Sequence, residues 1–423
     1  MVPADAILEN TAAVVTMAPR GADPLGVIPA GVVALAGSRI AWVGPPDQLR
    51  SQVHLSTGHR RWDAGGALVT PGWIDPHTHL IFAGDRAAEF ERRLSGETYQ
   101  QIAAAGGGIL STVRATRAAP LEELVERGRR SLDRYLAQGV TTLEAKSGYG
   151  LELATEIKML EAIRRLDAEH PIELLATFLG AHEVAPEFRG RTDAYVDEVV
   201  RVMIPEVARR RLARFCDVFC EQGVFDIVQS RRILETGISH GLTPKFHADE
   251  FVDLGGAKLA AELGAASADH LLQASPEGIS AMARAGVVAT LLPGTPYFLR
   301  LGRYADARAF LAAGVEVALA TDFNPGSCMS ENLGLTMNLA ATQMGMAPAQ
   351  CLRAVTMGAA RALRLEDSHG SIEAGKQADL ALFEVPDYCH LVYHFGVNHC
   401  VGVIKAGQWV WPDRDGASRE LLQ

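Results

Sequence analysis

The sequence predicts an α/β fold, a (β/α)8 TIM-like barrel with a small β-sandwich domain formed by both chain termini. Through the middle of the chain, apolar strand-like runs alternate with helical segments, the pattern of parallel βα units. At both ends the runs are short, rich in β-formers and separated by Gly and Pro. The chain has 423 residues, 48% of them hydrophobic and 21% charged, enough for one large barrel and a smaller unit.

The middle of the chain supplies the barrel, which we expect to span residues 71–365. Helical segments such as 152–169, 195–211 and 257–263 separate the strands. Eight units over roughly 290 residues fit a (β/α)8 barrel, whose active site lies at the carboxyl ends of its strands. The eight strand candidates are 73–79, 140–146, 173–180, 216–222, 243–247, 265–270, 287–293 and 315–322.

The two ends of the chain are expected to form one composite domain from residues 1–70 and 366–423. The runs at 31–36 and 39–44 near the start resemble in style those at 378–384 and 401–411 near the end. Apolar runs bounded by turn residues indicate strands. Because chain termini often lie close together, we assign both groups of strands to one small β-domain.

Composition excludes several classes of partner. The net charge of -10 argues against nucleic acid, since phosphate binding needs clustered Lys and Arg. The basic run at 209–211 closes a helical pattern, where cations favour the helix dipole, so we interpret it as a solvated helix end. Without a run of eighteen apolar residues, no membrane partner is expected.

The compartment is predicted from the N-terminus and the cysteines. The first residues lack a basic segment followed by an apolar core, so no secretory signal is expected. The cysteines have no spacing of a disulfide framework. We therefore predict a cytoplasmic protein with reduced thiols. The six cysteines are Cys216, Cys220, Cys328, Cys351, Cys389 and Cys400.

Polar residues end most of the predicted barrel strands. A parallel strand covered on both faces should be apolar, so a repeated polar ending indicates a catalytic rim. The residues concerned are His79, Lys146, Gln222, His247, His270 and Asp322.

Four residues at this rim predict a metal site. His77 and His79 are two positions apart at a strand end, so their rings project to the same side. With His247 and Asp322 they offer three imidazole nitrogens and one carboxylate, which suits one Zn²⁺ or Fe ion per chain. Taken singly, a histidine could be structural and the aspartate a helix N-cap. Together the four favour a metal centre.

The neighbours of these ligands predict hydrolytic chemistry. A bound metal lowers the pKa of its water to near 7. Glu250, three residues past His247, can carry the water proton to a leaving nitrogen, and His270 can orient the water or stabilise an oxyanion. We therefore expect Glu250, His270 and Asp322 to be catalytic.

The order His-x-His, His, His, Asp on strands one, five, six and eight resembles the amidohydrolase superfamily. Segments 77–86, 106–109, 144–150, 178–184 and 322–327 are similar to the imidazolonepropionase family, over about residues 70–365. The resemblance implies a metal-dependent hydrolase of histidine degradation. In that family, metal-activated water attacks the ring carbonyl of 4-imidazolone-5-propanoate, breaks the ring C–N bond and gives N-formimidoyl-L-glutamate.

The resemblance also implies how the substrate, a small molecule carrying a carboxylate, is bound. Arg86 matches the residue that holds the propionate group, which suits a planar bidentate donor. A homodimer is a further expectation from the superfamily. The other residues expected to contact substrate or product are Tyr149, His182, Glu250, Asn324, Gly326 and Ser327.

Three alternatives remain open at this point. A deaminase of a nucleobase-like heterocycle would share His247 and Glu250, but it differs in the loop after the first strand and around Tyr149. A binuclear dihydroorotase-like site needs a lysine ending the fourth strand, whereas that strand ends at 219–222 in Phe-Cys-Glu-Gln. A catalytically inactive binding barrel is disfavoured because the ligands and Glu250 are all present.

Overall fold

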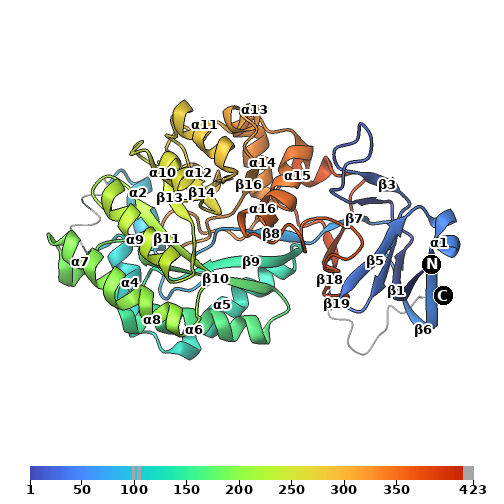
Figure 1. The fold of residues 1–423 in the computed structure, drawn as a ribbon, viewed down its shortest axis with the longest axis horizontal. Coiled ribbons are helices and arrows are strands. Elements are labelled where there is room, and N and C mark those ends of the chain that lie inside the picture. Colours follow the sequence, from blue (N-terminus) through green and yellow to red (C-terminus); the bar gives the residue numbers. More distant parts are fainter. Residues whose placement is uncertain (98–100, 102–105, 413–423) are drawn as a thin grey trace.

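The computed structural model describes residues 1–97, 101 and 106–412. Its largest part is a ring of parallel strands surrounded by helices, seen at the left of Figure 1. The barrel strands are β8 (Trp73–Asp75), β9 (Val140–Lys146), β10 (Glu173–Ala181), β11 (Phe215–Cys220), β12 (Thr243–Pro244), β13 (Phe246–Ala248), β14 (Ser267–His270), β15 (Val288–Leu291) and β16 (Val317–Leu319).

Each barrel strand pairs in parallel with the strand that follows it in the chain. The fifth strand is split at Lys245 into β12 and β13. The ring closes beyond the ends of β8 and β16, where Thr78 and Phe323 form a parallel bridge and the His79 amide donates to the Phe323 carbonyl (2.9 Å). The predicted (β/α)8 barrel is confirmed.

Most of the helices cover the outside of this ring, whereas the first helix lies with the strands of the chain ends at the right of Figure 1. Their local sequences explain their bounds: in α5 the apolar residues recur every three to four positions on the buried face, as an amphipathic helix requires. The helices are α1 (Pro46–Gln52), α2 (Ala87–Leu94), α4 (Ile109–Ala118), α5 (Leu121–Leu136), α6 (Leu153–Glu169), α7 (Thr192–Glu198), α8 (Ile204–Arg209), α9 (Ile227–Ser239), α10 (Gly256–Glu262), α11 (Pro276–Ala285), α12 (Gly294–Leu299), α13 (Ala307–Ala312), α14 (Leu333–Met344), α15 (Pro348–Ala354), α16 (Met357–Ala362) and α17 (His390–Tyr393), with a 3₁₀ turn η1 (Pro186–Phe188) and a π-helical turn η2 (Val199–Met203).

Strands from both chain ends build two further sheets beside the barrel, at the right of Figure 1. One has the order β5-β4-β1-β6 and the other β19-β18-β17-β7-β2-β3. The antiparallel pairing of β7 with β17 confirms the composite origin. These strands are β1 (Val2–Glu9), β2 (Ala13–Val15), β3 (Val27–Pro29), β4 (Val32–Ala36), β5 (Arg39–Gly44), β6 (Val53–Asp63), β7 (Leu68–Pro71), β17 (Leu380–Phe383), β18 (Cys400–Lys405) and β19 (Gln408–Trp411).

The two parts meet at the amino-terminal end of the barrel. The ring of Trp73 stacks on Phe383 with centroids 4.7 Å apart. Nearby, Lys405 Nζ lies 3.0 Å from Glu173 Oε2 and 2.7 Å from Asp379 Oδ2. The domain boundaries at 70/71 and 365/366 stay a prediction, and β7 crosses the first of them.

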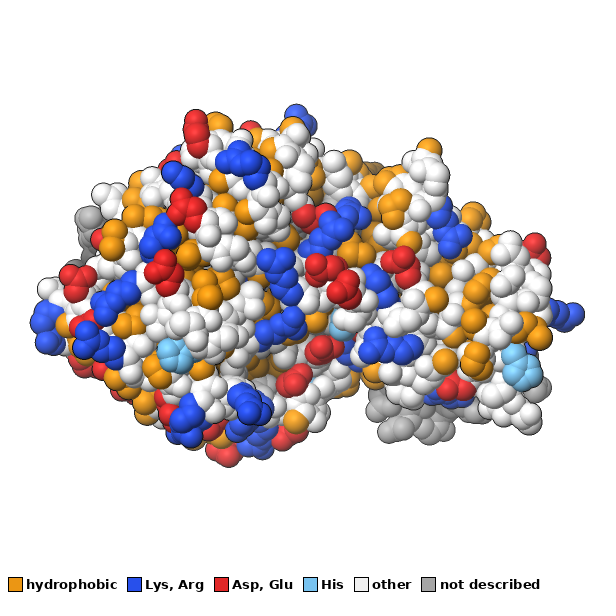
Figure 2. All heavy atoms as spheres, in the orientation of Figure 1, with side chains coloured by type: hydrophobic (Ala, Val, Ile, Leu, Met, Phe, Trp, Pro, Cys, Tyr) orange, Lys and Arg blue, Asp and Glu red, His pale blue; other side chains and the backbone are white. Residues whose placement is uncertain are grey.

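Several expectations about surface and thiols can be compared with the structure. On the face shown in Figure 2, acidic and basic side chains are interspersed. No helix among the described residues is long and apolar enough to span a bilayer. All six cysteines lie in the described part of the chain, and each is a free thiol.

Candidate active site

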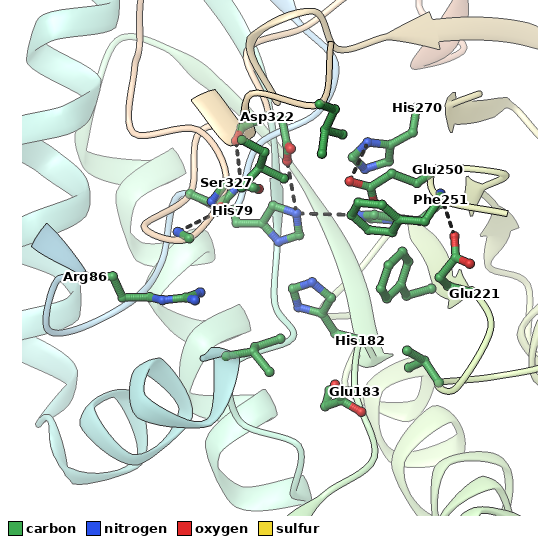
Figure 3. A pocket seen from close by; sticks show the side chains of 18 of the residues that line it. His79, Arg86, His182, Glu183, Glu221, Glu250, Phe251, His270, Asp322 and Ser327 are labelled. Carbon is green, nitrogen blue, oxygen red and sulfur yellow. Dashed lines mark hydrogen bonds and ion pairs between the residues drawn. The ribbon is translucent and has the colours of Figure 1, made fainter. Parts of the chain in front are cut away.

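A cavity of about 640 Å³ opens at the carboxyl ends of the barrel strands. Its wall includes five of the six predicted rim residues, all but Lys146, with side chains from the loops that follow most barrel strands (Figure 3). Every residue expected to contact substrate lines it, namely Arg86, Tyr149, His182, Glu250, Asn324, Gly326 and Ser327.

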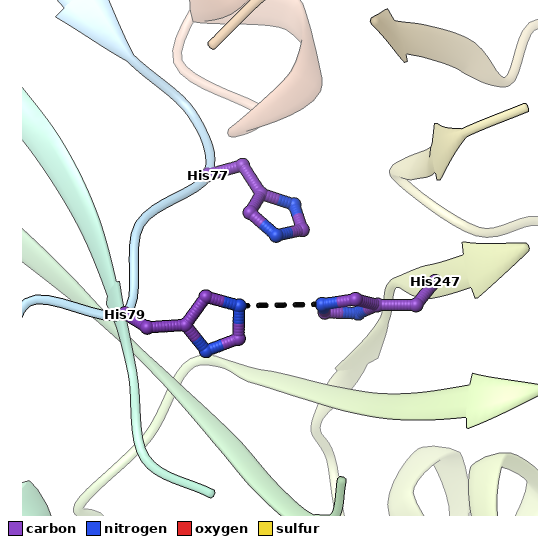
Figure 4. A group of neighbouring side chains, drawn as sticks. All are labelled: His77, His79 and His247. Carbon is purple, nitrogen blue, oxygen red and sulfur yellow. Dashed lines mark hydrogen bonds between the residues drawn. The ribbon is translucent and has the colours of Figure 1, made fainter. Parts of the chain in front are cut away.

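The four expected metal ligands converge at the floor of this cavity (Figure 4 shows the three histidines). His77 Nε2 lies 3.4 Å and His79 Nε2 3.5 Å from Asp322 Oδ1. His247 Nε2 is 3.5 Å from His79 Nε2. These residues come from the first, fifth and eighth βα units, so the closed barrel alone brings them together.

The donor atoms fit a divalent ion. His77 Nε2 is buried without a hydrogen-bond partner, as expected of an atom that serves as a metal ligand. Four tetrahedral ligands about 2.0–2.1 Å from a zinc ion are about 3.3 Å apart, close to the spacing of these atoms. His270 also lies within reach, in a second group with His77 and Asp322. The residues present therefore match one mononuclear site.

Two of the ligand imidazoles, His77 and His79, are held neutral, as metal ligands must be. Burial lowers the pKa of His77 and His79 well below the usual range, and neighbouring cationic groups lower it further. Burial likewise raises the pKa of Asp322 to about 6, against a hydrogen bond from Thr295 that lowers it. Thr295 Oγ1 donates to Oδ2 of Asp322 (2.5 Å), while Oδ1 faces the histidines.

The backbone places the ligands differently from the expected strand ends. The strand containing the His-x-His pair was predicted to run to residue 79, but β8 ends at Asp75. His79, Gln222 and Asp322 all lie beyond their strands, and Asp322 has a φ of 53°. Such left-handed backbone is uncommon outside glycine and concentrates at functional sites. The carboxylate of Asp322 faces His77 and His79.

Two of the ligand histidines each have a carboxylate beside the Nδ1 atom, on the side of the ring away from the metal position. His77 Nδ1 donates to Asp269 Oδ2 (2.6 Å), which leaves Nε2 for the metal position. Asp217 Oδ2 lies 2.9 Å from His247 Nδ1, although not aligned as a hydrogen bond, and Asp217 Oδ1 accepts from the His247 amide. Such partners fix the orientation of a ligand ring. The sequence did not reveal either aspartate.

Beneath them lies a group that we call the buried charge network: Glu144, Lys146, Asp217, Lys245 and Asp269. All five side chains are fully buried. Lys146 Nζ lies 2.9 Å from Glu144 Oε1 and 2.8 Å from Asp217 Oδ2. Lys245 Nζ lies 3.1 Å from Glu144 Oε2 and donates to the Pro76 carbonyl (2.8 Å).

Lys146 was predicted to line the catalytic rim, and this was wrong. Its side chain is fully buried in the network rather than in the cavity wall. Burial would lower the pKa of its ammonium group, but Asp217, Glu144 and Asp269 raise it above the usual value, so Lys146 stays charged. Charged residues inside strands β9, β11 and β14 were a signal of this network, because buried parallel strands are otherwise apolar.

Glu250 and His270 form one side of the cavity. The Oε1 atom of Glu250 lies 3.7 Å from His270 Nδ1, and both side chains are buried. Burial raises the pKa of Glu250 well above its usual range, and Asp322 and Glu221 raise it further. Glu221 Oε2 also accepts from the Phe251 amide (2.8 Å), which fixes the loop that carries Glu250.

The opposite side of the cavity holds the polar groups expected to bind substrate. In Figure 3, Arg86 enters from the side opposite Glu250 and His270, with His182 between them. Arg86 Nε pairs with Glu89 Oε2 (2.8 Å). A Cβ atom on Gly326 would meet Arg86 Nη1 at 2.2 Å, so a larger residue here would displace the guanidinium from its present position.

His182 and Asn324 are held in place by the backbone. His182 Nδ1 lies 3.0 Å from the Gly148 carbonyl, and burial first, then His247, lowers the pKa of His182 to about 3. Its ring is therefore neutral, with Nδ1 as the donor. Asn324 Oδ1 accepts from the Gly326 and Ser327 amides (2.8 Å each), which shapes the turn after Asp322.

The chain is similar to proteins of known name and fold. Residues 232–410 match the model of the amidohydrolase family. Among solved structures, a zinc-bound adenosine deaminase from Xanthomonas campestris superposes with a TM-score of 0.70 at 19% identity, covering 96% of this chain and 93% of that chain. Guanine deaminase from E. coli gives 0.71 at 15% identity, covering 96% and 98%. At such identities the likeness concerns the fold.

Curated relatives are much more similar in sequence. An imidazolonepropionase from Geobacillus kaustophilus (strain HTA426) is 53% identical over 390 residues, covering 92% of this chain and 92% of the relative. One from Symbiobacterium thermophilum is 49% identical over 416 residues, covering 97% and 98%. The chain therefore belongs to the imidazolonepropionase family, within the amidohydrolases.

Proposed function

We propose that this protein is a metal-dependent hydrolase that converts 4-imidazolone-5-propanoate to N-formimidoyl-L-glutamate in histidine degradation. A bond forms between a water oxygen and the ring carbonyl carbon, the ring C–N bond breaks, and the released nitrogen takes a proton. The observation that carries the proposal is one cavity with three imidazoles and a carboxylate converging on its floor, Glu250 and His270 on one side and a guanidinium on the other.

We propose that His77, His79, His247 and Asp322 hold one Zn²⁺ or Fe ion. The convergence of their donor atoms and the unpartnered Nε2 of His77 support this set. When bound, a divalent ion of this kind supplies water whose pKa is lowered to near 7, so that hydroxide is available at neutral pH.

Glu250 is proposed to move the proton. Its raised pKa suits a group that must accept a proton from water and then give it up. His270, 3.7 Å away, can orient the water or donate to the developing oxyanion. Asp322 completes the catalytic group because its Oδ1 atom lies beside both His77 and His79.

The remaining polar groups are proposed to orient the ring and its side arm. Arg86 binds the propionate carboxylate through its Nη edge, since Nε is already paired with Glu89. Tyr149 and His182 contact the ring. Asn324, Gly326 and Ser327 offer polar atoms from the turn after Asp322 to the substrate and product backbone.

The test is loss of the ultraviolet absorbance of imidazolone propionate on adding the purified protein, with parallel assays on cytosine and guanine. We expect turnover of the imidazolone alone. Turnover of a nucleobase, with none of the imidazolone, would replace the proposal by the deaminase alternative. The cytoplasmic location and the homodimer stay predictions.

A further inference from the structure

We propose that Arg93 is a second carboxylate-binding residue. Together with Arg86 it would determine specificity for the propionate group of the substrate. No sequence pattern pointed to Arg93. The inference rests on the proposed function and extends it, since it assigns the anion-binding end of the cavity to two guanidinium groups rather than one.

Helix geometry places the two arginines on the same side. Arg86 is the N-cap of α2, and Arg93 lies seven residues later, two helical turns further on. Both reach Gly326: Arg86 Nη1 would lie 2.2 Å from a Cβ placed there, and Arg93 Nη1 donates to the Gly326 carbonyl (3.3 Å). The two guanidinium groups therefore flank the turn that follows Asp322.

At the end of the cavity beside α2, two guanidinium groups share one nearby carboxylate, Glu89. Among the described residues that line it, Arg86 and Arg93 are the two Lys or Arg side chains. Glu89 pairs with Arg86 and also accepts from the Gly108 amide and the Ser111 hydroxyl. Within the described ranges Arg93 has no carboxylate within 4.0 Å. An anion bound here would supply the missing charge.

Partial burial of Arg93 strengthens its attraction for a bound carboxylate. Burial lowers the pKa of Arg93, and the positive charge of Arg86 lowers it further, while the negative charge of Glu89 offsets only part of this. A cation in this setting interacts strongly with an incoming carboxylate because solvent screens the pair less than at an open surface. Carboxylate groups of the substrate's own class have two oxygens, enough for one guanidinium on each.

Two aromatic rings hold the guanidinium in position before a ligand arrives. Its carbon lies 5.2 Å from the ring centroid of Phe298 and 5.8 Å from that of Phe90. The two rings stack on each other with centroids 4.9 Å apart. Phe298 belongs to α12, which follows the seventh barrel strand, so Arg93 spans from the first βα unit to the seventh. Pre-positioning of this kind reduces the entropy cost of binding.

A purely structural role is the competing explanation, because the same contacts tie α2 to α12. The two roles differ in what they do to substrates of different charge. A structural tie affects all substrates alike, whereas a carboxylate contact affects only the anionic one. The experiment therefore compares imidazolone propionate with its neutral propionamide analogue.

The variants are Arg93→Gln and, as a matched control, Arg92→Gln. Arg92 is the adjacent residue of α2 and pairs with Glu97 instead of lining the cavity. For Arg93→Gln we expect KM for the carboxylate substrate to rise by about ten- to a hundredfold, the scale of a lost charged hydrogen bond, with kcat within about twofold. KM for the propionamide should stay unchanged, and Arg92→Gln should match the wild type for both.

The outcomes separate this inference from the proposed function. Equal effects of Arg93→Gln on both substrates, or no effect on either, would overturn the role of Arg93 while leaving the hydrolase intact. Absence of turnover by the wild type would overturn the proposed function and this inference with it. If Arg93→Gln is unstable, Arg93→Lys serves instead: it keeps the charge but loses the planar fork, and a KM rise confined to the carboxylate substrate is again required.

Discussion

Replacing Lys146 by methionine removes one of the two positive charges in the buried charge network and nearly keeps the length of the side chain. The ammonium group makes hydrogen bonds to Glu144 (2.9 Å) and Asp217 (2.8 Å) at full burial. Methionine leaves these carboxylates facing one another with Lys245 as the remaining cation. The variant therefore tests whether the network holds the barrel interior and the metal site together.

The expected loss of stability follows from these two bonds. Each charged hydrogen bond contributes about 1.5–3 kcal/mol, and breaking a buried ion pair by removing one partner costs about 3–5 kcal/mol. The two routes agree, so we expect the free energy of unfolding of metal-free Lys146→Met to fall by about 3–5 kcal/mol. Urea denaturation of the metal-free protein measures it.

A second effect should appear in metal affinity. Lys146 touches no proposed ligand, but it positions Asp217, which supports His247. Loss of a group that orients a ligand typically costs about 10–100-fold in metal affinity. We expect a loss of that size when the metal-free variant is titrated with Zn²⁺ and the bound ion is measured.

Two controls make the result specific. Lys258→Met makes the same chemical change on an exposed part of α10 and should shift stability by at most about 0.5 kcal/mol. Adding Glu144→Gln to Lys146→Met removes one negative charge and should recover about 1 kcal/mol or more. If Lys146→Met stays within about 1 kcal/mol of the wild type and binds zinc equally well, the network does not support the site and the reasoning is refuted.

Three further predictions follow from the site and the domain junction. His247→Ala should lower both bound metal, from close to one ion per chain, and activity, as elemental analysis and the absorbance assay will show; two ions per wild-type chain would contradict the mononuclear site. Glu250→Gln should keep metal and KM but lose about a hundredfold or more in kcat, and near-normal turnover would exclude Glu250 from proton transfer. A hydrogen bond from His369 and the charge of Lys405 hold the pKa of Glu173 at about 2, below its usual 4.5 and against the effect of burial; its stabilising contribution is therefore present above pH 4.5 and lost as the pH falls toward 2. Unfolding free energy measured over that range should fall less steeply in Glu173→Gln, and identical slopes would contradict the assignment.

Much of the barrel was predictable because its signal is local. The second strand was predicted at 140–146 and is β9 (Val140–Lys146), and the helix expected at 152–169 is α6 (Leu153–Glu169). Apolar runs and helical periodicity are properties of neighbouring residues. The order of strands then follows from the right-handed connections of parallel βα units, so the rim that gathers His77, His79, His247 and Asp322 could be anticipated.

Strand ends at the rim were less predictable, because long-range pairing decides them. The first strand was expected to reach His79, but β8 ends at Asp75, and beyond it the chain pairs with the residues that follow β16. Sequence alone does not show which backbone groups will meet across the closing seam. Arg93 was missed for a similar reason, since Phe298 and Gly326 are far from it in the chain.

The buried charge network was the feature least predictable from the sequence. Its negative charge gives a physical reason for its position beneath the proposed metal site. The three carboxylates of the network oppose its two lysines, and Asp322 beside the ligand histidines adds one more negative charge. Each of these six side chains is at most 2% exposed, and together they carry a formal charge of −2. His77 and His79 are neutral and contribute none. A divalent cation at the floor of the cavity would balance the formal charge of these six side chains, which in a low dielectric would otherwise favour the uptake of protons. Two of these carboxylates also orient ligand histidines: Asp269 lies beside His77 and Asp217 beside His247. The groups that position the ligands therefore also provide the negative charge that favours a divalent cation.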